Sequence, residues 1–307
     1  LPGEAAILHM DLSSLAHGEQ RALIADSLPC PPSDRLRESI ESKAEGNPFY
    51  IEQMVMYLLD NRMIECRDGK AVLTSPGLRL PGSVVEIIIS RVDALEAAIR
   101  KTVKHASVLG RRFNIRVLSR MLSGRPVDED LRAGAEARIW NRLSELQYIF
   151  RHALIRDSVY EMQLEGQLAG LHLMAGQIIE ELYSDDERLY SDLSFHFEKA
   201  GRRKKMLEYT LKAADHAREN YRNREAMEMY QKYLDGETEV REGLKAAMRL
   251  AEVTSLVGEW DRALSLYRTI VDRAGESGMK ELLADAIVKM GFLHHRMGDN
   301  DDALECF

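Results

Sequence analysis

The sequence has 307 residues, of which 45% are hydrophobic and 30% are charged, and its formal net charge is −8. This composition is typical of a globular protein with two or three hydrophobic cores, and it excludes a disordered chain. No apolar run approaches the roughly 18 residues of a membrane span, and the net negative charge gives no overall attraction to nucleic acid or to anionic lipid.

The three cysteines, Cys30, Cys66 and Cys306, are far apart, odd in number and without a CxxC pair or a nearby histidine cluster. Such spacing indicates neither a disulfide framework nor a zinc site. We therefore predict three reduced thiols and no metal site. Because the N-terminus also has no basic-then-apolar leader, we predict a cytoplasmic chain that does not enter a membrane.

Residues 1–80 are predicted to contain one strand, three helices and a hairpin. Alternating apolar residues indicate a strand over Ala5–Leu12, whose partner strands we expect in a preceding domain. Ser13-Ser14, Ser33 or Asp34, and Asn47-Pro48 are helix-start signals, and Asp68-Gly69 is a hairpin turn. The predicted elements are helices His17–Leu28, Arg35–Glu45 and Phe49–Asp60 and a hairpin over Met63–Thr74.

Residues 81–183 read as short helices with tight turns. The helices are predicted at Ser83–Glu96, Ala98–Leu109, Asn114–Leu122, Trp140–Leu146 and Leu168–Tyr183. Gln147–Phe150 reads as a strand, so this part indicates a helical bundle that leads into a winged-helix-like unit. A winged helix needs a two-stranded hairpin here, and one strand is found. Either the wing has been lost or residues are missing from the sequence between about 144 and 149, and we favour missing residues.

The same region holds the largest local charge asymmetry. Residues 99–126 contain eight Lys or Arg and no Asp or Glu. The six residues that would form a basic patch for DNA phosphates or for an acidic neighbouring domain are Lys101, Lys104, Arg111, Arg112, Arg116 and Arg120. We favour a solvated face, or a face that meets the acidic nucleotide-binding domain or the repeats, over a DNA-binding one. Only Phe113 interleaves with the charges, which also disfavours stacking on single-stranded bases.

His152 lies in the run Phe150-Arg151-His152-Ala153, next to charged residues. A catalytic histidine needs a nucleophile or a substrate proton within reach, and no Ser or Cys at a turn accompanies this one. We therefore predict that His152 is a hydrogen-bonded core or interface residue and that this chain is not an enzyme.

Residues 184–307 contain a repeat. Gly258, Ala263 and Tyr267 are followed forty residues later by Gly298, Ala303 and Phe307. A glycine that ends one helix, a small residue where the next helix touches it and an aromatic residue one turn later are typical of tetratricopeptide hairpins. Such hairpins stack into a superhelix with a groove that binds a protein or peptide. The predicted helices include Leu189–Ala200, Lys205–Glu219 and Arg224–Leu234. The adjacent His294-His295 pair is not predicted to chelate a metal, because neighbouring side chains on a helix diverge.

Several blocks in order carry a resemblance to the signal-transduction (STAND) ATPases, the multidomain AAA-type NTPases of bacterial regulators and of class III adenylyl cyclase-associated modules. The blocks are residues 45–53 (EGNPFYIEQ), 80–84 (LPGSV), 91–95 (RVDAL), 106–113 (ASVLGRRF), 150–160 (FRHALIRDSVY) and 171–172 (LH). The resemblance covers residues 5–235, and tetratricopeptide repeats behind it fit the family. It implies an end of the nucleotide-binding domain and a helical lid over 1–80, a winged-helix-like coupling domain over 81–183 and repeats over 184–307.

The resemblance also implies that Gly46, Asn47, Pro48 and Phe49 lie near the nucleotide, where Pro48 would report on nucleotide state. The alternative is a helix C-cap followed by proline in a first turn, which needs no ligand. No GxxxxGK[ST] motif is present, because Gly69-Lys70 has Ile64 and Ala71 at the flanking positions. ATP or ADP with Mg²⁺ is therefore expected only for a larger parent protein. We expect this chain, which opens on Leu1 and stops at Phe307 inside a repeat, to be a piece of that protein.

These observations predict a mainly α regulatory arm that couples nucleotide state in an upstream domain to a protein or peptide at the repeats. One alternative is a DNA-binding transcription regulator that acts through the basic segment, and another is a plain tetratricopeptide scaffold. The output domain, the ligand and the oligomeric state are not encoded in these residues.

Overall fold

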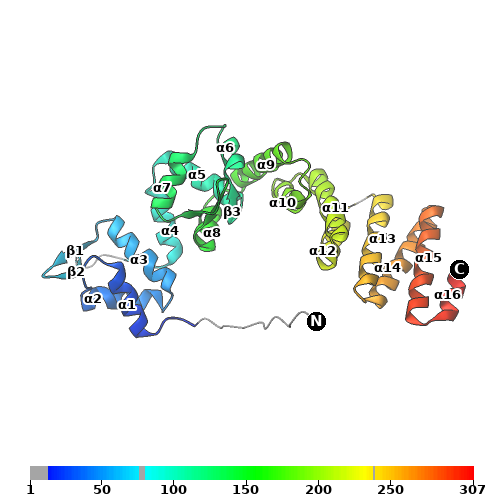
Figure 1. Ribbon diagram of the computed structural model, residues 1–307, viewed down its shortest axis with the longest axis horizontal. Coiled ribbons are helices and arrows are strands. Elements are labelled where there is room, and N and C mark those ends of the chain that lie inside the picture. The colour runs from blue at the N-terminus through cyan, green and yellow to red at the C-terminus, as the bar shows by residue number, and fades with distance from the viewer. Residues whose placement is uncertain (1–12, 76–79, 238) are drawn as a thin grey trace. The chain divides into compact units, whose positions relative to one another are not determined.

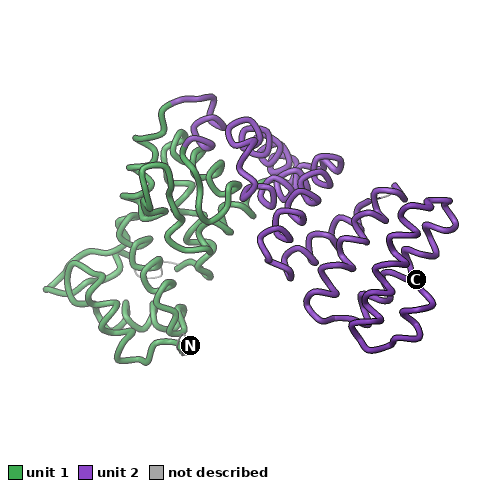
Figure 2. The backbone as a smooth tube through the Cα atoms, turned by 45° about the vertical axis from the view of Figure 1, so that its right-hand side comes forward, with its two compact units in different colours: residues 1–115, 126–163 green, residues 116–125, 164–307 purple. Residues whose placement is uncertain are grey.

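The computed structural model describes residues 13–75, 80–237 and 239–307. Over these residues the chain forms sixteen α-helices, one 3-10 helix and five short strands, so the prediction of a mainly α fold with a few short strands is confirmed (Figure 1). Two compact units are present. Unit 1 contains residues 1–115 and 126–163, and unit 2 contains residues 116–125 and 164–307 (Figure 2).

Unit 1 begins with three helices that pack on a hairpin. They are α1 (His17–Ser27), α2 (Asp34–Ala44) and α3 (Pro48–Asp60), followed by β1 (Ile64–Arg67) and β2 (Lys70–Leu73). Ile24, Ile40, Ile51 and Met54 are fully buried between them. These elements agree with the sequence prediction, except that α1 is capped by Glu19 and not by the serine pair. The predicted strand Ala5–Leu12 lies outside the described residues.

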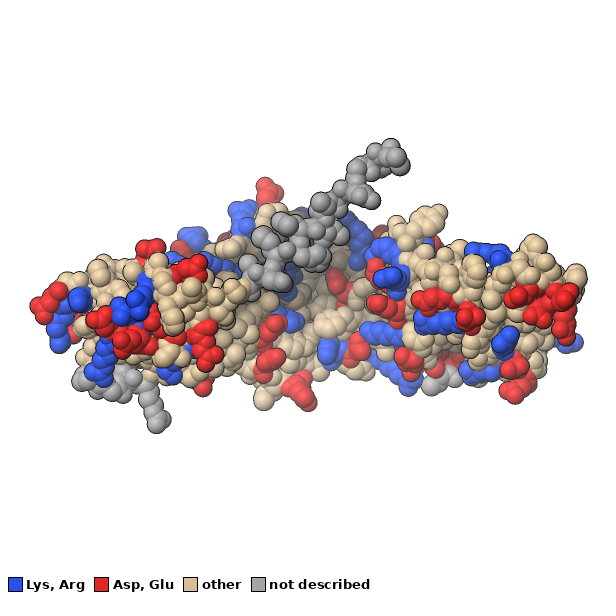
Figure 3. Space-filling model, turned by 90° about the horizontal axis from the view of Figure 1, so that it is seen from below, with Lys and Arg blue, Asp and Glu red and all other residues tan. Residues whose placement is uncertain are grey.

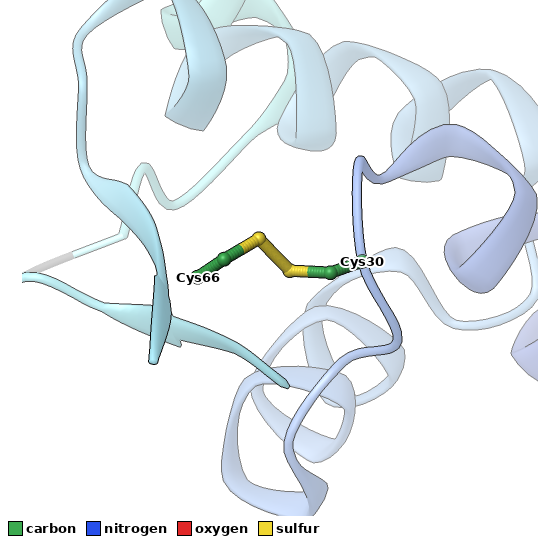
Figure 4. Close-up of a disulfide and its surroundings, with 2 residues drawn as sticks. All are labelled: Cys30 and Cys66. Carbon is green, nitrogen blue, oxygen red and sulfur yellow. A yellow bond between two sulfur atoms is a disulfide. The ribbon is translucent and has the colours of Figure 1, made fainter. Parts of the chain in front are cut away.

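The prediction of three reduced cysteines is wrong, because Cys30 and Cys66 form a disulfide with Cα atoms 6.5 Å apart (Figure 4). The segment after α1 runs beside β2, where the Ala71 amide donates to the Pro31 carbonyl at 2.8 Å. This tertiary contact brings Cys30 against β1, and a separation of 36 residues gives no sign of it. The remaining cysteine, Cys306, keeps a free thiol.

The second part of unit 1 is a small sheet with helices around it. Its strands β3 (Arg112–Asn114), β4 (Trp140–Arg142) and β5 (Gln147–Phe150) are antiparallel in the order β3-β5-β4. The helices are α4 (Val84–Asp93), α5 (Ala97–Val108), α7 (Asp128–Glu136) and α8 (Ala153–Glu161), while α6 (Ile115–Met121) begins at the end of unit 1 and continues into unit 2.

The predicted helix over Trp140–Leu146 is wrong, and so is the interpretation that residues are missing from the sequence near 144–149. Trp140–Arg142 is a strand, and the Leu143 amide donates to the Gln147 carbonyl at 2.8 Å, which closes a complete hairpin. A three-residue strand is too short to show the alternation that distinguishes a strand from a helix. The sequence pattern therefore identified only the longer strand of the pair.

An aromatic cluster explains why these strands form. Phe113, Trp140 and Phe150 are buried, and their ring centroids lie 5.4 to 5.8 Å apart. The Trp140 indole N–H donates to the Leu131 carbonyl of α7 at 2.8 Å. A Cβ at Gly134 would lie 2.2 Å from the Trp140 ring, so only glycine lets α7 approach the sheet this closely.

Unit 2 is a series of helices in which each packs on the next along the chain. Its helices are α9 (Glu165–Leu182), α10 (Tyr190–Lys199), α11 (Arg203–Glu219), α12 (Asn223–Gly236), α13 (Val240–Leu256), α14 (Trp260–Glu276), α15 (Lys280–Met297) and α16 (Asn300–Cys306). The hydrophobic clusters extend from each hairpin to its neighbour, as from α11 and α12 to α13. Among the described helices, none combines the length and apolar character that crossing a membrane requires.

Candidate functional site

Phe49 and His152, which are far apart in the sequence, meet on unit 1. Their ring centroids lie 4.0 Å apart, with an angle of 36° between the ring planes. Phe49 belongs to the first turn of α3, and His152 is the residue just before α8. Both side chains are partly exposed. The fold therefore joins two of the blocks that carry the family resemblance at one place on the surface.

The backbone at Gly46 explains the first of these blocks. Gly46 has φ +80°, and a Cβ there would lie 2.8 Å from the Ser14 side chain and 2.9 Å from the Leu15 carbonyl. The Asn47 carboxamide oxygen accepts hydrogen bonds from the first turn of α3, and Pro48 is the first residue of that helix. These contacts explain the local structure without a ligand, and they leave the Asn47 and Pro48 side chains exposed.

Other members of the blocks also contact one another. The Arg91 guanidinium donates to the Gln53 side chain at 2.5 Å and to the Ala137 carbonyl at 2.8 Å. The Arg156 guanidinium donates to the Ser107 carbonyl at 2.7 Å. Some of the residues that carry the resemblance therefore contact one another within unit 1.

A cleft of about 360 Å³ lies beside Arg91, lined by α3, α4, α8 and the segment after α7. Burial lowers the pKa of Arg91, and the carboxylate of Asp60, 3.4 Å away, opposes this shift. The guanidinium stays protonated at neutral pH, because an arginine pKa is far above 7. With these partners Arg91 links α4 to α3 and to the segment after α7.

His152 has an electrostatic environment that disfavours its charged form. Burial lowers the pKa of His152, and the cationic side chains of Arg151 and Arg111 lower it further, while Glu52 opposes them. The imidazole against Phe49 is therefore neutral at pH 7. A neutral ring between arginines can pack against an aromatic surface or accept a hydrogen bond.

The predicted basic patch is divided between the two units. Its members Lys101, Lys104, Arg111 and Arg112 belong to unit 1, whereas Arg116 and Arg120 belong to unit 2. Arg120 pairs with Glu181 of α9. On the face shown in Figure 3, basic and acidic side chains are intermixed.

The predicted repeat residues occupy equivalent places in successive hairpins. Gly258 and Gly298 have φ +87° and +91° at the turns, and Tyr221 has φ 57° at the corresponding turn between α11 and α12. The small residues that follow are Ala226, Ala263 and Ala303, all buried. The aromatic residues one turn later are Tyr230 and Tyr267, which are buried, and Phe307, which is exposed and contacts Phe292.

Sequence analysis missed a row of charges on the first helices of these hairpins, α11, α13 and α15. We call Asp215, Arg249, Glu252 and Lys289 the charge ladder. Arg249 pairs with Asp215 of the preceding hairpin at 2.7 Å, and Lys289 pairs with Glu252 of its preceding hairpin. Both bases lie nine residues before the left-handed turn residue of their own hairpin, a spacing that would have revealed them. The ladder links neighbouring repeats.

Comparison with known proteins gives a short family match and a distant structural likeness. The model of a domain of unknown function (DUF8739) matches residues 19–72. No curated protein matches the sequence. A crystal structure of a signal transduction ATPase with numerous domains (STAND) with a tetratricopeptide repeat sensor, from Pyrococcus horikoshii, is 13% identical, with a TM-score of 0.36. That alignment covers 95% of this chain and 59% of the archaeal chain, so this chain spans about three fifths of the archaeal protein.

Proposed function

We propose that this chain is a non-catalytic regulatory arm of a signal-transduction ATPase, which couples nucleotide state in a neighbouring domain to protein or peptide binding at the repeats. The observation that carries the proposal is the Phe49–His152 contact. It joins two blocks of the sequence resemblance at the surface of unit 1 and leaves Pro48 exposed beside it. ATP or ADP with Mg²⁺ would bind the neighbouring domain, not this chain.

Two further features support a coupling role for unit 1 and a partner-binding role for unit 2. The order of elements from α5 to β5, with the β4–β5 hairpin as a wing, agrees with a winged-helix-like coupling domain. In unit 2, the helix hairpins and the charge ladder supply a repetitive polar face of the kind that recognises a peptide or protein. A ligand there can shift the ATPase only if it binds two states of the arm unequally.

The DNA-binding alternative is disfavoured by α7. This helix lies just before the wing, in the place of the helix that enters the major groove in helix-turn-helix proteins. It carries Asp128, Glu129, Asp130 and Glu136 with a single base, Arg132. A helix with this charge repels phosphates. Gel-shift binding that persists at physiological salt would support the DNA-binding function instead.

The proposal is tested by Pro48→Ala in the protein that carries this chain together with its ATPase domain. We expect the variant to change the rate of ATP hydrolysis or of ADP release. Pro29→Ala is the matched control, since Pro29 is also exposed in unit 1 but lies before α2. Equal rates for the two variants would contradict a nucleotide-linked role, as would the absence of a P-loop from the complete protein. Unchanged nucleotide kinetics with intact peptide binding would indicate a plain scaffold.

The cytoplasmic location stays a prediction. The Cys30–Cys66 disulfide opposes it, because thiols in the cytosol of mesophilic cells are usually kept reduced. Alkylation of free thiols in freshly lysed cells, followed by mass spectrometry, would give the redox state of this pair.

A further inference from the structure

Between α10 and α16 of unit 2, five of the described turns have the same backbone structure, and three of them lie between the two helices of one hairpin. The side chains of these three turns can be compared position by position. In each, a residue with positive φ is followed by an amide that donates to the carbonyl five residues earlier. These hydrogen bonds run from Arg222 to Ala217 (2.8 Å), from Glu259 to Thr254 (3.2 Å) and from Asp299 to His294 (3.0 Å). The turns join α11 to α12, α13 to α14 and α15 to α16.

The first two turns hold an ion pair, and the third does not. Arg222 pairs with Glu225 at 2.8 Å, and Arg262 pairs with Glu259 at 3.0 Å, so each turn places one base against one acid. At the same two positions the third turn has two acids, Asp299 and Asp302. Two carboxylates without the arginine repel each other unless another cation lies between them.

His294 supplies a third polar atom at this place. Its side chain is 7% exposed, and its Nδ1 atom is buried without a hydrogen-bond partner. The Nδ1 atom lies 3.7 Å from a carboxylate oxygen of Asp299 and 3.7 Å from one of Asp302. A buried polar atom usually has a partner, and this separation is too long for a hydrogen bond. The neighbouring His295 contacts Asn300 instead, so it is not part of the group.

We propose that His294, Asp299 and Asp302, which we call the metal triad, bind one divalent transition-metal ion such as Zn²⁺. Imidazole and carboxylates are ligands that such ions take. The three ligand atoms lie within 4.8 Å of one another. Two ligands on one ion are at most about 4.2 Å apart, because each bond is about 2.1 Å long. A small rotation of an exposed aspartate closes that gap, and water completes the coordination.

The ion takes the place of the arginine found in the other two turns. It joins His294 on α15 to Asp302 on α16 and neutralises the acidic pair, so it holds the last two described helices together. This role does not depend on the regulatory function proposed above. Sequence analysis predicted no metal here because it considered His294 with His295, whereas the turn brings His294 to acids five and eight residues later.

The test is calorimetric titration of the purified chain with ZnCl₂ alone, after removal of metals with a chelator. We expect one saturable equivalent, and a rise in the unfolding temperature of unit 2 that the chelator reverses. With Co²⁺ as a spectroscopic probe, we expect d–d bands without a thiolate charge-transfer band. A thiolate band would assign binding to Cys306 and would overturn the proposal.

Asp302→Arg is the decisive variant, because it restores the base that Arg262 provides in the preceding hairpin and should keep the fold. We expect it to weaken Zn²⁺ binding by more than roughly tenfold. Asp301→Asn is the matched control, since Asp301 is exposed in the same turn but outside the metal triad, and it should bind as the unmodified chain does. Asp302→Asn tests the same ligand without adding a charge.

The proposal fails if no saturable equivalent binds, or if Asp302→Arg and Asp302→Asn bind Zn²⁺ as tightly as Asp301→Asn. It also fails on a combination of two results. The first is that Asp302→Asn lowers the stability of the chelator-treated chain only at low pH, and the second is that Zn²⁺ does not change the unfolding temperature of unit 2. That combination would show that a protonated His294 is the cation between the two aspartates.

Discussion

Unit 1 and unit 2 are stabilised by contacts of different range along the chain. In unit 1 the important contacts join distant segments, as in the Phe49–His152 ring contact, the pairing of β3 with β5 and the Cys30–Cys66 disulfide. In unit 2 each helix packs on its neighbour, and the charge ladder links one hairpin to the next. A domain with long-range contacts unfolds as one body, whereas a repeat array loses stability locally. Changes in unit 1 should therefore affect the whole unit, and changes in unit 2 should stay near their hairpin.

The largest expected effect concerns the disulfide of unit 1. Replacing both cysteines, by Cys30→Ser with Cys66→Ser, frees a loop of 36 residues in the unfolded chain. The chain-entropy estimate for a loop of this length is about 3 to 4 kcal/mol of lost stability. Hydrogen exchange measured at increasing denaturant concentration should show a lower unfolding free energy for unit 1 and an unchanged one for unit 2. An equal loss in both units would contradict the separation between them.

A smaller loss is expected when the close packing of α7 on the sheet is disturbed. Gly134→Ala places a methyl group against the Trp140 ring, which is held in the aromatic cluster, and should cost about 1 to 3 kcal/mol. The matched change in unit 2 is Gly243→Ala in α13, where the added Cβ meets nothing within 4 Å. That variant should gain about 0.5 to 1 kcal/mol from helix propensity. Urea unfolding of both variants should show lower stability for Gly134→Ala and higher stability for Gly243→Ala.

A gain in stability is expected at one turn of unit 2. Tyr221 is 88% exposed and has φ 57°, at the position where the next two hairpins have glycine. A left-handed backbone costs a non-glycine residue about 1 to 2 kcal/mol. Glycine avoids this cost, but it loses more conformational entropy on folding, which cancels part of the gain in stability. Tyr221→Gly should therefore stabilise the α11–α12 hairpin by about 1 kcal/mol or less, whereas Tyr221→Ala keeps the strain. Thermal unfolding distinguishes the two, and equal midpoints would contradict the strain.

The smallest effect is a pH dependence of unit 1. Because the folded environment lowers the pKa of His152, the unfolded chain takes up a proton at a higher pH than the folded chain does. Stability should therefore fall as the pH drops below about 6.5, the ordinary histidine value, and this loss should level off below the folded pKa. Comparing urea midpoints at pH 7.5 and pH 5.5 for the unmodified chain and for His152→Gln isolates this residue from other histidines. A larger pH effect in the variant would contradict the direction of the shift.

The same difference in range explains what could be predicted from the sequence. Helices α10, α11 and α12 of unit 2 were predicted within a few residues, because their periodicity and turn signals are local. For the later hairpins the sequence predicted the turns at Gly258 and Gly298, without bounds for the helices around them. In unit 1 the pattern gave α1 to α3 and the first hairpin, but not the strand at Trp140–Arg142, which depends on burial against Phe113 and Phe150.

The functional groups that were missed also depend on contacts in space. No residue type or spacing shows that Cys30 lies against Cys66. The charge ladder and the metal triad combine residues from different helices, so they become visible only when the hairpins are aligned by their turns. The block residues 46–49 and 150–153 were identified by resemblance, and their contact is a feature of the fold.

The central claim is that unit 1 contacts a nucleotide-binding domain while unit 2 offers its repeats to a partner. Hydrogen exchange with mass spectrometry on the protein that carries this chain and its ATPase domain tests the claim directly, with ADP compared with a non-hydrolysable ATP analogue. We expect exchange to change with nucleotide in the peptides that contain Asn47–Phe49 and Arg151–Ala153. Nucleotide-dependent exchange in unit 2 with none at these two segments of unit 1 would contradict the account.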